Sequence, residues 1–149
     1  MKKKIAIACD HGGYELKLTV VEHLKTNGYD VVDFGCDSTA SVDYPDYAVP
    51  ASKAVAAGEC ELGILICGTG IGMSLCANKV HGIRAACCSD TFSARMTRMH
   101  NNANILCLGA RVVGAGLAVD LVDLFLKTEF EGDRHIKRIE KVMAIESNQ

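Results

Sequence analysis

The sequence contains no tryptophan, two prolines and only 5% aromatic residues in 149 positions. A core must therefore be built mainly from aliphatic side chains, which the 49% hydrophobic fraction supplies in sufficient number for one domain of this length. Neither sign of charge is in excess, because 16 basic residues stand against 18 acidic ones. A nucleic-acid-binding surface requires a basic excess, so this balance argues against nucleic acid and favours a small-molecule ligand.

No apolar stretch reaches the roughly 18 residues that a membrane-spanning helix requires. Met1–Lys4 and Ile5–Cys9 briefly imitate a signal peptide, but Asp10 and His11 end the apolar run too early. The eight cysteines include no Cys-x-x-Cys pair and no Cys/His pair at zinc spacing. We therefore expect reduced thiols, a cytoplasmic protein, no membrane association and no bound metal.

Five short apolar runs alternate along the chain with longer amphipathic stretches. Nearly continuous apolar runs of this length are typical of strands buried on both faces of a parallel sheet. The alternation predicts an α/β fold, a three-layer αβα sandwich with about five parallel strands, in one domain over residues 1–149. The predicted strands are Ile5–Cys9, Val31–Phe34, Leu62–Cys67, Arg84–Cys88 and Asn104–Leu108.

The segments between and after these strands have helical periodicity. Leu117, Leu121 and Phe125 repeat at four-residue spacing, so we expect the helix that contains them to be largely buried. The other predicted helices are Tyr14–Asn27, Pro45 to about Ala57, Gly72–Val80, Thr91–His100, and about Asp133 to Ile145 with Asp133 as N-cap.

A glycine-rich turn, Cys67–Gly72, follows the third predicted strand, at the sheet edge where α/β proteins bind ligands. Alternating glycines let the backbone approach a ligand closely and aim amide N–H groups at an anion. The spacing matches neither the dinucleotide fingerprint nor the P-loop. A tight turn alone would explain it, but three glycines in five residues favour a site for a phosphate or a reaction oxyanion.

Two further groups at predicted strand ends could perform acid–base chemistry. Any one of eight cysteines is ordinarily core filler, but the start of a helix beside Cys67 favours a thiolate, and hence a nucleophile or general base. Asp10-His11 follows the first strand. Such a pair suits proton transfer or binding of a sugar phosphate, although both residue types are also common in loops.

Basic residues near the C-terminus have two interpretations. Arg134 and Arg138 are four residues apart and share a helix face. They form either a solvated stripe or a phosphate clamp that Arg111 would join, since guanidinium groups bind phosphate in a bidentate way. His100 ends a predicted helix, where a histidine can simply serve as a cap, and the pattern does not decide between capping and function.

These residues together resemble the type B ribose-5-phosphate isomerases, of the family shared with galactose-6-phosphate isomerase. The similarity runs from Ile5 to about Ile145, nearly the whole chain, and the order and spacing of its segments are specific. The segments that carry it are Cys9–Gly13, Asp43–Pro45, Gly63–Gly72, Ala77–Lys79, Gly82–Ala85, His100–Asn101, Gly109–Gly114 and Gly132–His135.

The resemblance implies a Rossmann-like fold and an aldose–ketose isomerase that interconverts D-ribose 5-phosphate and D-ribulose 5-phosphate without a cofactor. Cys67 would move the proton between C2 and C1, with Thr69 beside it and the enediolate held by amides of the loop Gly68, Gly70, Ile71 and Gly72. Asp10 and His100 would open the furanose ring. The phosphate would be held by His11, Arg111, Arg134 and Arg138, and the sugar by Tyr44 and Asn101.

The resemblance also implies a homodimer, or a tetramer, with active sites at subunit interfaces and His100 supplied by the partner. Some members use a glutamate in the glycine loop, where this chain has Met73, so the chain is similar to the thiol type. The alternatives are an isomerase of a six-carbon sugar phosphate (allose 6-phosphate or galactose 6-phosphate), a non-catalytic nucleotide- or phosphate-binding module, and a zinc protein. The zinc ligands would be Cys87, Cys88, His81 and His100.

Overall fold

The computed structural model describes all 149 residues and contains one sheet of five parallel strands. The strand order β2-β1-β3-β5-β4 places β3 at the centre, and each predicted strand is present with ends that differ by at most one residue. No helix is both long enough and apolar enough to cross a membrane. The strands are β1 (Lys4–Cys9), β2 (Asp30–Asp33), β3 (Leu62–Cys67), β4 (Ala85–Cys87) and β5 (Ile105–Gly109).

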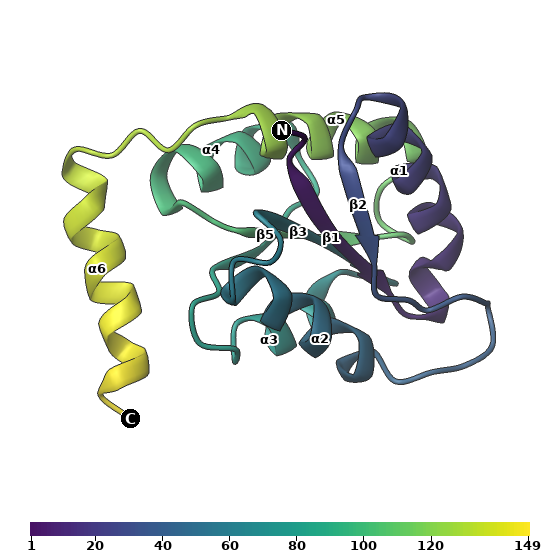
Figure 1. Cartoon of the computed structure of the whole chain (residues 1–149), viewed down its shortest axis with the longest axis horizontal. Helices are drawn as coiled ribbons and strands as arrows, with labels where there is room; N and C mark the ends of the chain where they lie inside the picture. The colour runs from purple at the N-terminus through teal and green to yellow at the C-terminus, as the bar shows by residue number, and fades with distance from the viewer.

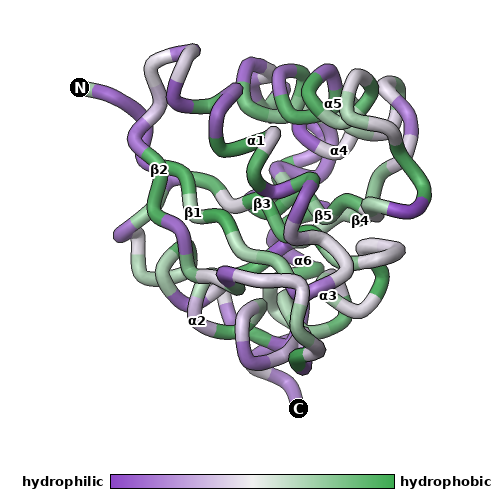
Figure 2. Tube along the Cα trace, turned by 90° about the vertical axis from the view of Figure 1, so that its right-hand side faces the viewer, coloured by the Kyte–Doolittle hydropathy of each residue, from purple (hydrophilic) through white to green (hydrophobic).

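Helices cover both faces of the sheet, which confirms the three-layer αβα sandwich (Figure 1). Figure 2 shows the hydrophobic strands β1, β3 and β5 between the two helical layers. One layer consists of α1 (Tyr14–Thr26), α4 (Thr91–Asn101) and α5 (Ala115–Lys127); the other consists of α2 (Pro45–Ala56) and α3 (Ile71–Ala77). A 3₁₀ turn, η1 (His11–Gly13), joins β1 to α1.

The core is aliphatic, as the composition predicts. Every residue of β3 is buried, because strands on both sides and helices on both faces surround it. In α5, Leu121 and Phe125 are fully buried, as expected for this helix, whereas Leu117 is 37% exposed. Leu117 lies in the first turn of the helix, where Ala115 and Gly116 are also exposed.

Helix α3 ends three residues earlier than predicted. Its predicted end was Val80, but the Asn78 side chain leaves the helix to bond the backbone of Ala85, accepting from N–H at 2.8 Å and donating to the carbonyl at 2.9 Å. This exchange ties the end of α3 to the start of β4. A side chain that bonds backbone groups outside the helix competes with helix continuation.

The last helix, α6 (Arg134–Ser147), stands away from the sandwich (Figure 1). Asp133 occupies the N-cap position as predicted, but its φ is 47° and its side chain caps no amide. The apolar side chains Ile136, Val142 and Ile145 are 48%, 49% and 55% exposed. The helix therefore presents an apolar surface that nothing else in the chain covers.

Candidate active site

The carboxyl edge of the sheet brings together three of the chain segments singled out from the sequence. β1, β3 and β5 are adjacent in the order β1-β3-β5, so the residues that follow them meet at one place. The ladder pairs Cys9 with Ile66 and Cys67 with Gly109, which sets the ends of the three strands level. Asp10 and His11, the glycine loop and Arg111 thus become neighbours.

The glycine loop holds the Cys67 thiol in a defined direction. Cys67 is 4% exposed, and its Sγ accepts the Gly70 N–H at 3.0 Å. Gly70 has φ +80°, and a Cβ there would lie 2.9 Å from Cys87 Sγ, so only glycine fits this turn. Thr69 is exposed in the same loop, and its Oγ1 accepts the Ile71 N–H at 3.2 Å. Two amides of the loop thus point at the polar groups of the site.

Asp10 and His11 border this loop through η1. The Asp10 carboxylate is nearly buried, 8% exposed, and accepts the Gly13 N–H at 3.1 Å. A Cβ built on Gly12 would lie 3.3 Å from Asp10 Oδ1 and 3.4 Å from Gly68 N, so the carboxylate lies close to the loop backbone. His11 Nδ1 accepts the Val42 N–H at 3.2 Å, which leaves Nε2 as its donor.

Arg111 and Tyr44 flank the loop on its other sides. A Cβ on Gly68 would lie 3.7 Å from Arg111 Cζ, and the Arg111 N–H donates to the Gly68 carbonyl at 3.0 Å. A Cβ on Gly72 would lie 2.9 Å from the Tyr44 ring. Arg111 pairs with no carboxylate, so its guanidinium is available to an anion.

The remaining predicted residues lie at the opposite edge of the sheet. Helix α4 runs back from the carboxyl edge, so His100 and Asn101 at its end stand near the start of β5. There the Asn104 N–H donates to the Arg84 carbonyl at 2.9 Å, which joins the residues directly before β5 and β4. The six residues of β3 separate this edge from Cys67, a span of about 17 Å at the usual strand rise.

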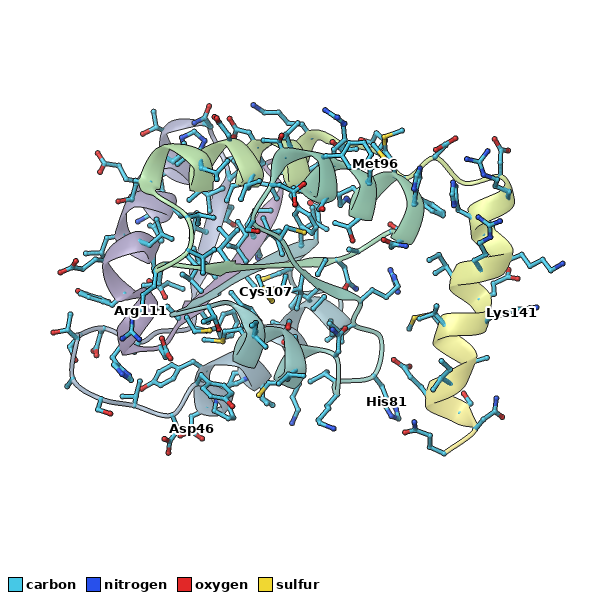
Figure 3. The ribbon with its side chains drawn as sticks, turned by 180° about the vertical axis from the view of Figure 1, so that it is seen from behind. Asp46, His81, Met96, Cys107, Arg111 and Lys141 are labelled. Atoms are coloured by element: carbon cyan, nitrogen blue, oxygen red, sulfur yellow. The ribbon has the colours of Figure 1, made fainter.

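Arg134 and Arg138 lie on α6, at the same end of the molecule as His100. Both are exposed, and neither pairs with a carboxylate. Figure 3 shows the separation, with Arg111 at one side of the molecule and Lys141 of α6 at the other. One chain therefore carries two separate groups of predicted site residues: Asp10, His11, Tyr44, Cys67–Gly72 and Arg111 in the first, and His100, Asn101, Arg134 and Arg138 in the second.

His100 belongs to a cluster that the sequence did not reveal. Its ring stacks on His135 with centroids 4.3 Å apart and planes at 14°. The Nε2 atoms of His100 and His135 lie 3.6 and 3.7 Å from Glu131 Oε2. Burial, and then the proximity of His100 and Arg134, lower the pKa of His135. The pattern of charged residues around Arg134 does not indicate that Glu131 and His135 contact His100, which lies about thirty positions earlier in the chain.

This cluster is also the one group of side chains that could offer three ligand atoms to a metal ion. Its ligand atoms lie within 4.8 Å of one another, but the stacked rings confine their nitrogen lone pairs to two nearly parallel planes, with ring centroids 4.3 Å apart. Tetrahedral zinc needs lone pairs that converge at about 2.0 Å. The set expected for a zinc protein, Cys87, Cys88, His81 and His100, does not form such a group.

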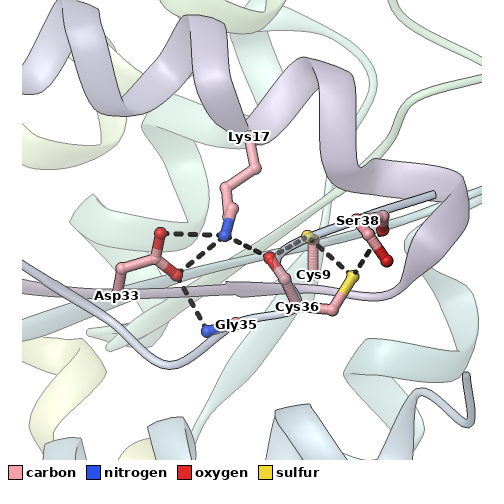
Figure 4. A network of polar contacts seen from close by, with 6 residues as sticks. All are labelled: Cys9, Lys17, Asp33, Gly35, Cys36 and Ser38. Carbon is pink, nitrogen blue, oxygen red and sulfur yellow. Dashed lines mark hydrogen bonds and ion pairs between the residues drawn. The ribbon is translucent and has the colours of Figure 1, made fainter. Parts of the chain in front are cut away.

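Lys17 forms a buried network beside the first group (Figure 4). Its side chain is 3% exposed, and Nζ donates to both Asp33 carboxylate oxygens at 2.9 and 2.8 Å and to the Cys36 carbonyl at 2.6 Å. Cys9 Sγ lies 3.8 Å from Cys36 Sγ, and burial raises the pKa of the Cys9 thiol to about 12, so it stays protonated. The sequence signal was a lysine in the apolar stripe of its helix.

Comparison with known proteins gives consistent relatives. The family model described as Ribose/Galactose Isomerase matches residues 5–142. Ribose-5-phosphate isomerase B of Escherichia coli is 50% identical over 147 residues, covering 99% of both chains. The structure of Clostridium thermocellum ribose-5-phosphate isomerase B superposes with a TM-score of 0.96 at 55% identity, covering 97% of this chain and 98% of that one. The Mycoplasma genitalium enzyme with bound ribulose-5-phosphate gives 0.95 at 44% identity, with coverage of 100% and 99%.

Proposed function

Because the chain belongs to the ribose/galactose isomerase family, we propose that it interconverts D-ribose 5-phosphate and D-ribulose 5-phosphate through an enediolate. The similarity to ribose-5-phosphate isomerases over the full length supports this substrate. The observation that carries the proposal is one thiol, held by a loop amide at 3.0 Å, beside an arginine that has no carboxylate partner.

Cys67 serves as the general base. As a thiolate it takes the proton from C2 of the open-chain aldose, and as a thiol it returns a proton to C1, while the hydroxyl proton on O2 passes to O1. The negative charge that develops on the substrate oxygens is stabilised by amides of Gly68–Gly72, with Thr69 beside the thiol. C2 is oxidised as C1 is reduced within the same molecule, so the reaction needs no redox cofactor, and the loop amides supply the charge stabilisation that a metal ion would otherwise give.

The second group of residues reaches this site from a second copy of the chain. A span of about 17 Å separates the two groups within one chain. In a two-fold dimer, the first group of each chain lies against the second group of the other chain. The partner subunit's His100 and this chain's Asp10 then open the furanose ring. His11 and Arg111, with Arg134 and Arg138 of the partner subunit, hold the phosphate. Tyr44 and the partner subunit's Asn101 contact the sugar.

The exposed apolar surface supports this assembly. Ile136, Val142 and Ile145 on α6 and Ile71 and Leu75 on α3 are between 48% and 59% exposed, and a second copy would cover such side chains. Residues 1–149 act as one domain whose last helix serves the assembly. The unit is a homodimer, or a tetramer built from two such dimers.

All eight cysteines are unpaired, which suits a reducing compartment, so we place the reaction in the cytoplasm. The remaining thiols beside the site are poor nucleophiles. Burial raises the pKa of the Cys87 thiol, and of Cys88 to about 11.

The test is conversion of ribose 5-phosphate to ribulose 5-phosphate in EDTA, with Cys67→Ala alongside. We expect turnover by the wild type and a loss of at least about 100-fold in the variant, because general acid–base groups contribute roughly 10²–10⁴-fold. Turnover of allose 6-phosphate and galactose 6-phosphate is measured in parallel, and its rate relative to ribose 5-phosphate tests the six-carbon alternative. An inactive wild type on ribose 5-phosphate would reject the proposal, and undiminished turnover by Cys67→Ala would reject the base.

A further inference from the structure

We propose that Glu131 and His135 are positioning residues for ring opening, which hold His100 in the orientation that this step requires. The inference rests on the proposed function, in which the partner subunit's active site uses His100 as its acid or base. Opening a furanose needs an imidazole whose reactive nitrogen and proton are aimed at the sugar. The structure contains groups that aim this ring from two sides.

The first side is the carboxylate. Glu131 Oε2 lies 3.6 Å from His100 Nε2. The Glu131 backbone is itself fixed, because its N–H donates to the Met99 carbonyl at 3.0 Å, next to His100. Arg98 adds a second tie between α4 and the same linker, donating from Nε to the Thr128 carbonyl at 3.3 Å. These hydrogen bonds fix the backbone of the linker relative to α4, and so they help to hold the Glu131 carboxylate beside His100.

The second side is the stacked ring. His135 covers one face of His100 at a centroid distance of 4.3 Å. His135 is only 5% exposed, yet its Nε2 has no hydrogen-bond partner. A buried polar atom without a partner costs stability, so its presence needs an explanation. Contact with the face of His100 supplies one.

Charge in the cluster favours His100 as the recipient of the carboxylate. Burial, His100, Arg134 and Arg138 all lower the pKa of His135, against the opposing effect of Glu131. A neutral His135 leaves the negative charge of Glu131 to His100 and avoids repulsion between two imidazolium rings. The nearly parallel rings also argue for stacking rather than joint metal binding.

The test separates ring opening from proton transfer at carbon. Ribulose 5-phosphate has no furanose form, so exchange of its C1 hydrogen in D₂O requires Cys67 but not His100. Ribose 5-phosphate must be opened first. For Glu131→Gln we expect kcat from ribose 5-phosphate to fall roughly 10- to 100-fold, with C1 exchange within about twofold of wild type. His135→Asn should show the same selective loss, and Glu131→Asp should recover part of it.

Glu140→Gln is the matched control, because Glu140 is exposed on α6 and pairs with no cation. Melting temperature and oligomeric mass are measured for every variant, and Glu131→Asp carries the test if Glu131→Gln does not fold. Equal loss of turnover and exchange, or no loss of either, would overturn the inference. A wild type that shows neither turnover nor exchange would overturn the proposed function, and this inference with it.

Discussion

A site assembled from two chains predicts that two inactive variants restore activity in one dimer. Cys67→Ala removes the base from the first group, and His100→Asn removes the ring-opening residue from the second. Each homodimer then carries the same defect in both sites. Because either group acts in acid–base steps, each should retain less than about 1% of wild-type turnover.

The heterodimer differs from both parents. One of its sites combines Cys67 and His100 from the two unaltered halves, and the other site combines both substitutions. With one intact site of two, its activity should be about half that of the wild-type dimer. Two affinity tags on co-expressed chains allow this heterodimer to be isolated, and its turnover of ribose 5-phosphate is measured per dimer.

A matched heterodimer provides the control. Cys67→Ala and Asp10→Asn both lie in the first group, so each site of that heterodimer carries one defect and activity should stay at the level of the parents. Restoration in this control, or no restoration in the Cys67→Ala/His100→Asn heterodimer, would refute a site shared between chains. The distance along β3 between the two sheet edges is the basis of this expectation.

Two further predictions concern stability. Lys17→Ala should lower the free energy of unfolding by about 2 kcal/mol, because it leaves a buried carbonyl and a half-exposed carboxylate unpaired. The melting temperature should fall by roughly 4–8 °C, whereas Lys25→Ala, at an exposed position, should change it little. Equal melting temperatures for the two variants would contradict a stabilising role of the network. His135 has a lowered pKa in the folded state, so the unfolded chain binds more protons and stability should fall as pH drops below about 6.5. Urea unfolding of His135→Gln should therefore vary less with pH in that range, and an unchanged slope would show that His135 does not contribute.

Much of the fold followed from local patterns. The five apolar runs became β1–β5 with ends displaced by at most one residue, because burial on both faces demands continuous apolar sequence. The glycine loop was also predictable, since the positive φ of Gly70 is a backbone requirement that the residue type itself expresses. Family membership, predicted from ordered segments along the chain, is confirmed by the relatives.

Errors arose where side chains competed with local periodicity. Asn78 ends α3 early because its side chain bonds the backbone of Ala85. Ala85 belongs to a strand, so the periodicity of the helix alone could not predict this contact. The Lys17 network was overlooked because a charge in an apolar stripe has meaning only when its partners, Asp33 and Cys36, are known.

The sequence by itself determined the elements and the chemistry available at the end of each strand. Only the tertiary structure decided which of these residues share a place. Strand order joined Asp10, Cys67 and Arg111, whereas the return direction of α4 carried His100 to the far edge, where it meets Glu131 and His135. The physical reason is that propensity and burial act over a few neighbouring residues, but distances between sites depend on how whole strands and helices are arranged.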